Sequence, residues 1–238
     1  REDTELNPLV RGNDQVYESI CGPCSDQFNL GEALKELSGV SEPVICKFET
    51  KPNIFSIKID NAFYLLGSAK DKLSSMEPVC VYRVNDLSAS NYIRPGSTYF
   101  PVGIYQHQKF DELSKAAEIF AIDRIAVLRM DVDNLGKIFS EAVPEEDRTF
   151  SRMASISRGL NDFFKYHLNT IVRGVEKDGF EEPLDIANRE IKKHGRMLTI
   201  VYSGGDDLFI VGHWLDVTEA SFDIQKYFNK TLSINILR

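Results

Sequence analysis

The sequence predicts an α+β protein whose C-terminal half is a ferredoxin-like split βαβ unit, preceded by a smaller, mainly antiparallel domain. A nearly continuous apolar run, 125–130, ends in aspartates, and a later apolar run leads into Gly204-Gly205-Asp206-Asp207. Between them, apolar residues recur every three or four positions from 150 to 172, as in an amphipathic helix. The resulting order of strand, helix, strand, hairpin, strand and helix is that of a split βαβ unit.

The length and composition limit the classes of protein to which this chain can belong. The chain has 238 residues, of which 42% are hydrophobic, enough for one large domain or two small ones. A net charge of -8 argues against extensive electrostatic binding of nucleic acid by this chain alone. ATP remains compatible, because Mg²⁺ supplies compensating charge. No apolar run reaches the roughly 18 residues of a membrane span and no signal peptide is visible, so we expect no membrane partner.

Residues 1–40 form a cysteine-containing segment, 41–120 a small adapter domain, and 121–238 the split βαβ domain. The chain starts without Met and stops after an apolar stretch, so we expect both ends to be cuts from a longer protein, with the C-terminus of the last domain truncated. The four cysteines are too few for a disulfide framework in a chain of this length, which predicts a reducing cytoplasm.

The first motif is Cys21-Gly22-Pro23-Cys24, whose turn suits a zinc knuckle that aims two thiolates at one ion. A structural site needs two more ligands. Cys46 and Cys80 each lie in an apolar, strand-like run, and we expect both to be buried core residues. Zinc at Cys21 and Cys24 therefore stays an alternative. A redox Cys-x-x-Cys needs a thioredoxin-like strand–helix context, and the sequence does not indicate one here.

Alternation and turn residues predict the elements of the first part, with no firm element in residues 1–20. The predicted elements are a helix over 29–37, strands over 44–48, 54–59, 62–66 and 78–84, a loop over 91–96 with an exposed Arg94, and a helix over 110–120.

The second part begins with the apolar strand 125–130 and continues with a helix from Gly136, the long helix 150–172 and an irregular surface excursion over 174–195. Strands 196–202 and 208–211 follow, and then a helix to 228 that Asp216 and Glu219 open as a capping box. In this order the first strand ends beside the hairpin. Asp131 and the Gly-Gly-Asp-Asp turn are therefore predicted neighbours.

Asp131, Asp206 and Asp207 are the candidate catalytic residues and metal ligands. Three converging carboxylates without His or Cys favour a hard cation, Mg²⁺ or Mn²⁺. Without a cation such clustered acids repel one another. Two such ions about 3.5–4 Å apart would clamp the attacking and leaving oxygens of a phosphoryl transfer. The alternative is that Gly-Gly-Asp-Asp is an ordinary hairpin turn.

Four residues are candidates for nucleotide binding. Gly204 and Gly205 lack side chains, so a nucleotide can approach the backbone. The Ser203 hydroxyl can donate to a base, ribose or phosphate. Lys137 lies near a helix N-terminus, where it can meet phosphate oxygens or simply be a solvated helix lysine. For Asp133, helix N-capping and metal ligation both remain open.

The joint pattern resembles the palm domain shared by nucleotidyl cyclases, family B polymerases and GGDEF-type diguanylate cyclases. More closely, it is similar to the large signature subunit of type III-A CRISPR effector complexes, a component of antiviral defence. The segments that carry the resemblance are 127–136, 150–153 with 155–158, Phe163-Phe164, and Tyr202-Ser203-Gly204-Gly205-Asp206-Asp207. Cys21 and Cys24 followed by Leu30-Gly31 also resemble the end of that family's cysteine-rich insert, which makes residues 1–40 its remnant.

The resemblance implies that the palm joins ATP molecules by 3′–5′ bonds into cyclic oligoadenylates. The 3′-hydroxyl of one ATP attacks the α-phosphate of the next, and pyrophosphate leaves. Asp131, Asp206 and Asp207 would hold the metals with the Val132 carbonyl assisting. Pairing of the guide RNA (crRNA) with target RNA would switch synthesis on, and a small subunit that holds the 5′ end of the guide would dock on the large subunit.

The chain departs from the family pattern in three ways. It has no counterpart of the His-Asp pair of the N-terminal HD nuclease, so we expect no DNase activity from it. The first, non-catalytic palm is missing, so the isolated chain is expected to react poorly. Phe139 stands about where diguanylate cyclases carry a guanine-reading Asn, which argues against guanine. The alternatives are a non-catalytic scaffold that docks the guide-holding subunit, or a free-standing cyclic-dinucleotide synthase.

Overall fold

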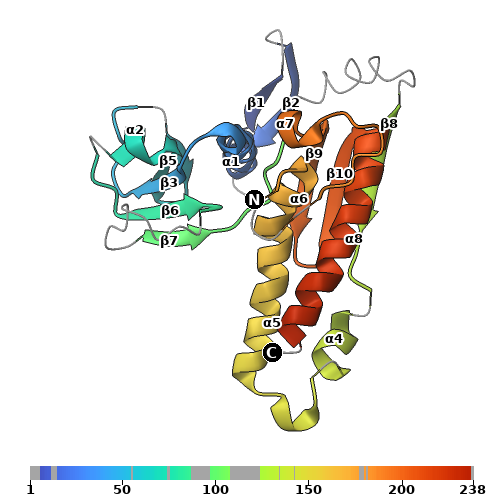
Figure 1. Ribbon diagram of the computed structural model, residues 1–238. Helices are drawn as coiled ribbons and strands as arrows, with labels where there is room; N and C mark the ends of the chain where they lie inside the picture. Colours follow the sequence, from blue (N-terminus) through green and yellow to red (C-terminus); the bar gives the residue numbers. More distant parts are fainter. Residues whose placement is uncertain are drawn as a thin grey trace. The chain divides into compact units, whose positions relative to one another are not determined.

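The computed structural model forms two compact units, Arg1–Phe100 and Pro101–Arg238, and each is described by itself (Figure 1). The described residues are 6–11, 15–54, 56–73, 76–86, 97–107, 124–133, 135–141, 143–176, 180 and 182–236. The predicted loop over 91–96, with Arg94, and the predicted helix over 110–120 lie outside them.

The first unit contains a five-stranded sheet in the order β4-β5-β3-β6-β7. All neighbouring strands are antiparallel except β6 and β7, which pair in parallel. Val44, Cys46 and Leu65 lie in its core cluster. The expectation of a mixed, mainly antiparallel sheet is confirmed. Its elements are β3 (Pro43–Phe48), β4 (Ile57–Ile59), β5 (Ala62–Ser68), α2 (Ala69–Leu73), β6 (Cys80–Val84) and β7 (Ser97–Phe100).

Before this sheet the structure differs from the sequence prediction. β1 (Leu6–Arg11) and β2 (Gln15–Cys21) form an antiparallel hairpin where no firm element was expected. The following helix, α1 (Gly22–Glu36), begins seven residues before the predicted start and leads into a 3₁₀ turn, η1 (Leu37–Gly39). Pro23 explains the early start, because proline is favoured in the first helical turn, where its missing N–H costs nothing.

The second unit is built on a three-stranded antiparallel sheet in the order β8-β10-β9. β8 (Ile125–Met130) has the predicted bounds, whereas β9 (Leu198–Gly204) and β10 (Asp207–His213) extend to the hairpin turn. Residues 101–107 run along the outer side of β9. There the Ile200 N–H donates to the Tyr105 carbonyl at 2.9 Å, and Gln106 bridges to Thr199.

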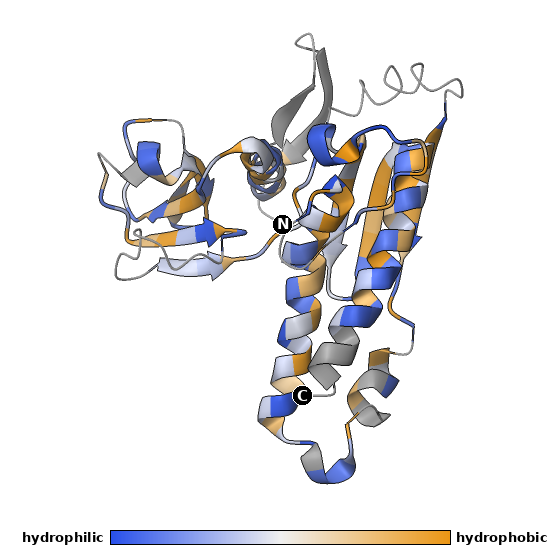
Figure 2. Cartoon of the chain, viewed as in Figure 1, coloured by the Kyte–Doolittle hydropathy of each residue, from blue (hydrophilic) through white to orange (hydrophobic). Residues whose placement is uncertain are grey.

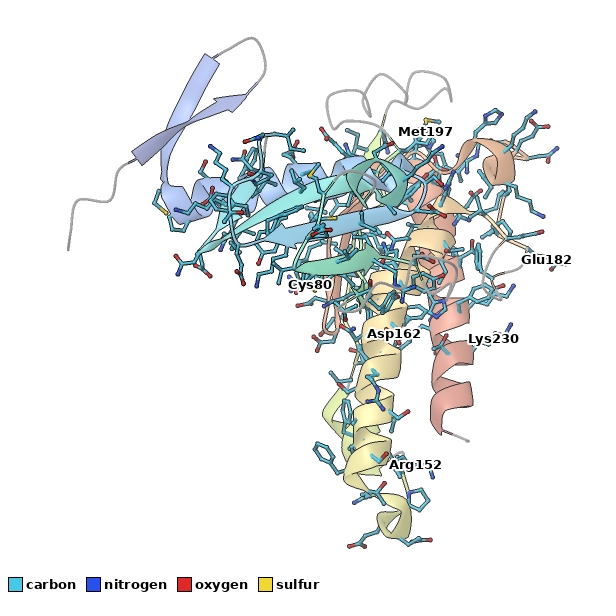
Figure 3. All side chains as sticks on the ribbon, turned by 90° about the vertical axis from the view of Figure 1, so that its left-hand side faces the viewer. Cys80, Arg152, Asp162, Glu182, Met197 and Lys230 are labelled. Carbon is cyan, nitrogen blue, oxygen red and sulfur yellow. The ribbon has the colours of Figure 1, made fainter. Side chains whose placement is uncertain are left out.

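The long helix predicted over 150–172 is present, with a wider π-helical turn in its middle. The Thr149 hydroxyl caps its start by accepting from the Arg152 N–H at 3.2 Å. Figure 3 labels Arg152 and Asp162 near the two ends of α5. In the described parts of the chain, no helix is both long enough and apolar enough to cross a membrane. The helical elements are α4 (Leu135–Glu141), η3 (Glu145–Asp147), α5 (Phe150–Asp162), η4 (Phe163–His167, the π turn), α6 (Leu168–Arg173), α7 (Ile191–His194) and α8 (Trp214–Ile236).

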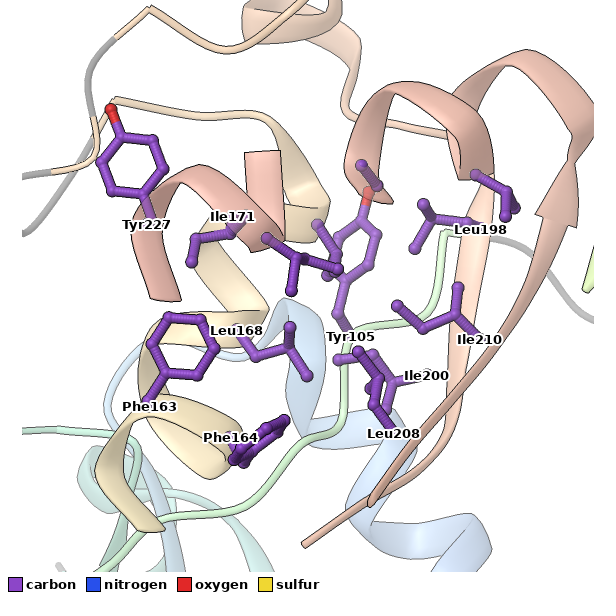
Figure 4. Close-up of a cluster of buried hydrophobic side chains, with 14 of the residues drawn as sticks. Tyr105, Phe163, Phe164, Leu168, Ile171, Leu198, Ile200, Leu208, Ile210 and Tyr227 are labelled. Atoms are coloured by element: carbon purple, nitrogen blue, oxygen red, sulfur yellow. The ribbon is translucent and has the colours of Figure 1, made fainter. Parts of the chain in front are cut away.

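The helices cover one face of this sheet. α8 packs on β8 and β10, and η4 packs on β9 (Figure 1). Leu128 and Met130 on β8 pack against the resulting core, while the alternate residues Ile125 and Val127 are 44% and 60% exposed. Figure 4 shows the core side chains from β9, β10, η4 and α6, and Figure 2 shows the apolar colouring of β9 and β10. The opposite face of the sheet is therefore the open one at β8.

The segment between α6 and β9 is only in part the surface excursion that the sequence predicted, because exposed residues such as Lys192 and Lys193 alternate with buried ones. Ile191 is 2% exposed, and Arg196 is fully buried with its Nη2 donating to Asp223 Oδ2 at 2.5 Å. Part of the charge in this segment is therefore paired inside the unit, while its other charged residues face solvent.

The predicted capping box of the last helix is also wrong. α8 already begins at Trp214, so Asp216 is its third residue and not its N-cap. Asp216 accepts from Arg189 Nη1 at 2.9 Å, and Glu219 accepts from Arg189 Nη2 at 2.5 Å. Burial raises the pKa of Glu219, which Arg189 opposes. Asp216 and Glu219 thus hold Arg189, and with it the segment before β9, against α8.

Candidate active site at the Gly204–Asp207 hairpin

The Gly-Gly-Asp-Asp stretch is a two-residue hairpin turn. Gly204 pairs with Asp207, which leaves Gly205 and Asp206 as the two central residues. Gly205 has φ +67°, a left-handed conformation that favours glycine at the first central position of such a turn. The turn therefore presents Asp206 and Asp207, both half-buried, side by side at the end of the sheet.

The strand register brings Asp131 to this turn. Met130 at the end of β8 pairs with Leu208 on β10, so Asp131 and Asp207 are the next residues on adjacent strands. Side chains alternate between the faces of a sheet. Leu208 and Met130 face the helices, so Asp207 at the end of its strand lies on the open side, and Asp131 follows Met130 at the same edge. The predicted neighbourhood of Asp131 and the hairpin is thus present in the fold.

The residues after Asp131 divide between core and solvent. Val132 is 8% exposed and belongs to the core cluster, whereas Asp131 and Asp133 are both exposed. A buried side chain at Val132 anchors the end of the strand between two solvent-facing acids. Lys137 is exposed and is the third residue of α4, within the first turn of that short helix as expected.

Ser203 is placed differently from the expectation. It pairs with Leu208, so its side chain lies on the face covered by helices, and its hydroxyl donates to the Phe164 carbonyl in η4. A hydroxyl has one proton to donate. In this structure that proton holds the β9 end to the helix, and only the oxygen lone pairs remain for another partner.

Gly204 and Gly205 differ in how much room surrounds the position that a side chain would take. A Cβ on Gly205 would meet nothing within 4 Å, so the backbone there is open to a ligand. A Cβ on Gly204 would lie 3.6 Å from Tyr202 Oη and 3.8 Å from Lys165 Cε. Tyr202 Oη also donates to the Gly204 carbonyl at 3.3 Å. Gly204 is therefore flanked by an aromatic ring and a lysine stem.

The carboxylates suit a hard cation by their chemistry. Oxygen ligands of this kind are the ones that Mg²⁺ and Mn²⁺ take, and the register brings two of them, Asp131 and Asp207, to one edge. Among the described residues, no group of three or more His, Cys, Asp and Glu is arranged to hold a metal ion. The donor set thus fits the expected ion, while the complete three-carboxylate arrangement is not assembled in this structure.

The cysteine motif lies in the other unit and has an unexpected context. Cys21 ends β2 and is the N-cap residue of α1, and Cys24 is exposed one turn along the helix. A strand therefore leads into a helix at this motif, but β2 belongs to a two-stranded antiparallel hairpin and not to a thioredoxin-like sheet. A hydrogen bond from the Cys24 thiol lowers the pKa of Cys21, and the same bond raises the pKa of Cys24. Cys46 is buried as predicted, whereas Cys80 is only half-buried.

The sequence reading missed two residues next to the turn. Lys165 in η4 reaches Gly204, and Asn169 in α6 holds residues 102–105 beside β9. Asn169 Oδ1 accepts from the Ile104 and Tyr105 amides at 2.8 and 3.0 Å. In the sequence, both residues are polar positions within the predicted helix 150–172. No local pattern predicts which residues they contact.

Comparisons with known proteins identify the fold of this unit and its family. The family model described as "Cas10/Cmr2, second palm domain" matches residues 124–236. Curated relatives are named CRISPR system single-strand-specific deoxyribonuclease Cas10/Csm1 (subtype III-A). The protein from Enterococcus italicus is 37% identical over 109 residues, covering 46% of this chain and 12% of the relative. The protein from Methanocaldococcus jannaschii is 30% identical over 263 residues, covering 98% and 31%.

Solved structures of similar fold include several of Csm1 together with Csm4. The Csm1-Csm4 subcomplex of a type III-A interference complex superposes with a TM-score of 0.61 at 22% identity, covering 82% of this chain and 27% of the other. A Csm1-Csm4 cassette in complex with one ATP gives 0.60 at 24% identity, covering 89% and 28%. A cassette in complex with cA3 gives 0.59 at 23%, covering 82% and 27%.

This chain spans less than a third of the length of these relatives, so the names describe proteins much longer than it. The matched residues 124–236 contain β8, both strands of the hairpin and the helices behind them. The chain therefore belongs to the Cas10 family of type III-A CRISPR effector subunits, and residues 124–236 match the second palm domain of that family.

Proposed function

We propose that this palm converts ATP into cyclic oligoadenylates by metal-dependent 3′–5′ nucleotidyl transfer within a type III-A effector complex. The observation that carries the proposal is the register that sets Asp131 beside Asp207 on the open side of the sheet. Solved Csm1-Csm4 cassettes with ATP, AMPPNP, pppApA and cA3 add support, because these ligands are a substrate, its analogue, an intermediate and a product of such a reaction.

Asp131, Asp206 and Asp207 are the residues that would hold Mg²⁺ or Mn²⁺, with the Val132 carbonyl as a further oxygen ligand. When bound, such ions would stabilise the charge that develops on the transferring phosphoryl group and activate the attacking 3′-hydroxyl. The open backbone at Gly205 admits the phosphate chain closely. Lys137, exposed in the first turn of α4, is proposed to contact phosphate oxygens.

The chain's own groups limit what the site does alone. Ser203 holds the turn to η4 through the Phe164 carbonyl, so its role toward a nucleotide is that of an acceptor. The helices cover one face of the sheet, and the acids lie on the other. A nucleotide bound there needs a second wall, and we propose that the first palm of the family supplies it. The isolated chain is therefore expected to react poorly.

The test is to incubate the intact effector complex with target RNA, ATP and Mn²⁺ or Mg²⁺ and to separate the products by chromatography. We expect cyclic oligoadenylate from the wild type and none from the Asp206→Ala, Asp207→Ala double variant. Unchanged product from the double variant would disprove the assignment. GTP offered in place of ATP tests a cyclic-dinucleotide synthase, and exclusive use of GTP would favour that alternative.

A second candidate function is docking of the subunit that holds the 5′ end of the guide RNA. The structural neighbours are Csm1-Csm4 complexes, which makes a Csm4-like subunit the expected partner, with crRNA and target RNA contacted through the complex. Docking predicts stoichiometric co-purification that the aspartate substitutions leave intact. Deleting the first unit, residues 1–100, tests whether that unit carries the contact.

The deoxyribonuclease activity in the relatives' name is not proposed for this chain. The HD-type His-Asp pair expected for that activity has no counterpart in the sequence. Single-stranded DNA incubated with the purified chain and a divalent metal is the direct test, and cleavage that survives purification would contradict the prediction.

A further inference from the structure

The π turn η4, which packs on the β9 strand of the hairpin, carries a lysine that has no assigned role. Lys165 is half-buried in η4, between the core residues Phe164 and Tyr166. Its Cε lies 3.8 Å from the position that a Cβ on Gly204 would take. A lysine on a helix that covers one face of the sheet therefore extends to the edge of the catalytic turn.

The backbone around Lys165 is held by side chains from β9 and from the adjoining helix α6. The Ser203 hydroxyl donates to the Phe164 carbonyl, and Asn169 Nδ2 donates to the Lys165 carbonyl at 2.8 Å and to the Tyr166 carbonyl at 3.3 Å. A π turn widens the helix and frees carbonyls from the usual ladder, and such turns are frequent at functional sites. Three consecutive carbonyls are thus tied down, so the position of Lys165 relative to the turn is well defined.

The lysine stem reaches the side of the strand on which the acids lie. Gly204 and Asp207 are a cross-strand pair, so their Cβ positions share one face of the sheet, about 5 Å apart. Tyr202, two residues before Gly204, shares that face and is 54% exposed. The stem of Lys165 therefore lies next to Gly204, on the face of the sheet that Gly204 shares with Asp207.

Within the part of the chain that the structure describes, the Lys165 ammonium group has no carboxylate partner. In the described ranges of the chain, the ion pairs within 4.0 Å do not include Lys165. Lysine stems commonly pack on a surface while the charged end stays in water. Among the described residues, the Lys165 ammonium group is therefore available to the negatively charged phosphate oxygens of a nucleotide bound at the rim of this site.

We infer that Lys165 binds the phosphate chain of the nucleotide held at the Gly204–Asp207 turn. The inference rests on the proposed function and adds a contact to it, from the η4 side of the turn. Glycine at position 204 is part of the same arrangement, because a side chain there would occupy the space between the lysine stem and Tyr202. Lys165 supplies a point charge to the phosphates, and a nucleoside without phosphates gains nothing from it.

The experiment measures binding of AMPPNP and of adenosine to the intact effector complex with target RNA and Mg²⁺. Lys165→Met keeps the length of the stem and removes the charge. Loss of a charge-assisted hydrogen bond should weaken AMPPNP binding about 10-fold to 100-fold. Adenosine binding should not change, and Lys165→Arg should restore most of the AMPPNP affinity. In turnover, the KM for ATP should rise more than kcat falls.

The matched control is Lys193→Met. Lys193 lies on α7, near the opposite end of β9, and its side chain is 71% exposed. The complex that carries Lys193→Met should bind AMPPNP with the affinity of the wild type. Wild-type affinity in Lys165→Met, or an equal loss for adenosine, overturns the role of Lys165 while the proposed function stands. A wild-type complex that binds no AMPPNP and forms no product overturns the proposed function and this inference together.

Discussion

Leu208 on β10 pairs with Met130 on β8, and this one pair sets the geometry of the candidate site. Both side chains enter the core against the helices. Asp207, which precedes Leu208, and Asp131, which follows Met130, are therefore neighbours at the sheet edge. A shift of one residue in this register would send the acids to opposite faces.

Asp131→Asn tests this neighbourhood with little risk to the fold, because Asp131 is exposed. The amide keeps the shape and removes the charge that a divalent cation needs. We expect product formation by the complex to fall by about 100-fold or more, the order of losing one group that stabilises the transition state. The measurement is the rate of oligoadenylate formation at saturating Mg²⁺. Retention of more than half of the activity would remove Asp131 from the site.

Gly212→Ala should destabilise the second unit. A Cβ at this position would lie 2.4 Å from Leu198 Cβ and 2.5 Å from the Met197 carbonyl oxygen, and backbone cannot move aside cheaply. Overpacking of this kind costs about 1–3 kcal/mol. Urea unfolding should show a lower midpoint at an unchanged slope. Gly136→Ala is the control, since a Cβ there meets nothing within 4 Å and should not lower the midpoint.

Arg196→Met should cost more than an ordinary core substitution. It leaves Asp223, which is 3% exposed, without its cation, although the Leu184 amide still donates to Asp223 at 3.1 Å. Breaking a buried ion pair from one side costs about 3–5 kcal/mol. Denaturant unfolding measures the loss. Adding Asp223→Asn should recover part of it, because the unpaired charge is then gone; a double variant no more stable than the single one would contradict this account.

His213 should make the stability of the second unit depend on pH. The side chain is fully buried, and burial lowers its pKa below the usual 6.5, which the nearby Asp216 carboxylate opposes at 3.6 Å. Below pH 6.5 the unfolded chain therefore binds more protons at His213 than the folded chain. Stability should fall as the pH drops from 6.5 toward the folded pKa, by at most about 1.4 kcal/mol per pH unit.

Thermal unfolding across the range of about pH 5 to pH 7.5 measures this slope. His213→Gln removes the titrating ring and should flatten the curve in that range. His194→Gln is the control, since that side chain is 64% exposed and should leave the slope as in the wild type. A slope that persists in His213→Gln assigns it to other groups.

The sequence by itself determined the elements whose signals are local. The apolar run 125–130 became β8 with the same bounds, and the three-to-four residue spacing over 150–172 became one long helix. The double glycine marked the turn, because only a residue without a Cβ takes a left-handed conformation there without strain. The strand order then followed from the split βαβ sequence of elements, and with it the proximity of Asp131 to the hairpin.

Only the tertiary structure decided which partner each polar side chain has. Asp216 and Glu219 read as a helix cap because capping needs only local spacing, yet they bind Arg189. Ser203 read as a nucleotide donor but bonds to Phe164, and Lys165 read as part of a helix but reaches Gly204. These contacts join residues far apart in the sequence. Hydrogen bonds and ion pairs at such separations depend on how helices and strands pack, which periodicity and spacing along the chain do not encode.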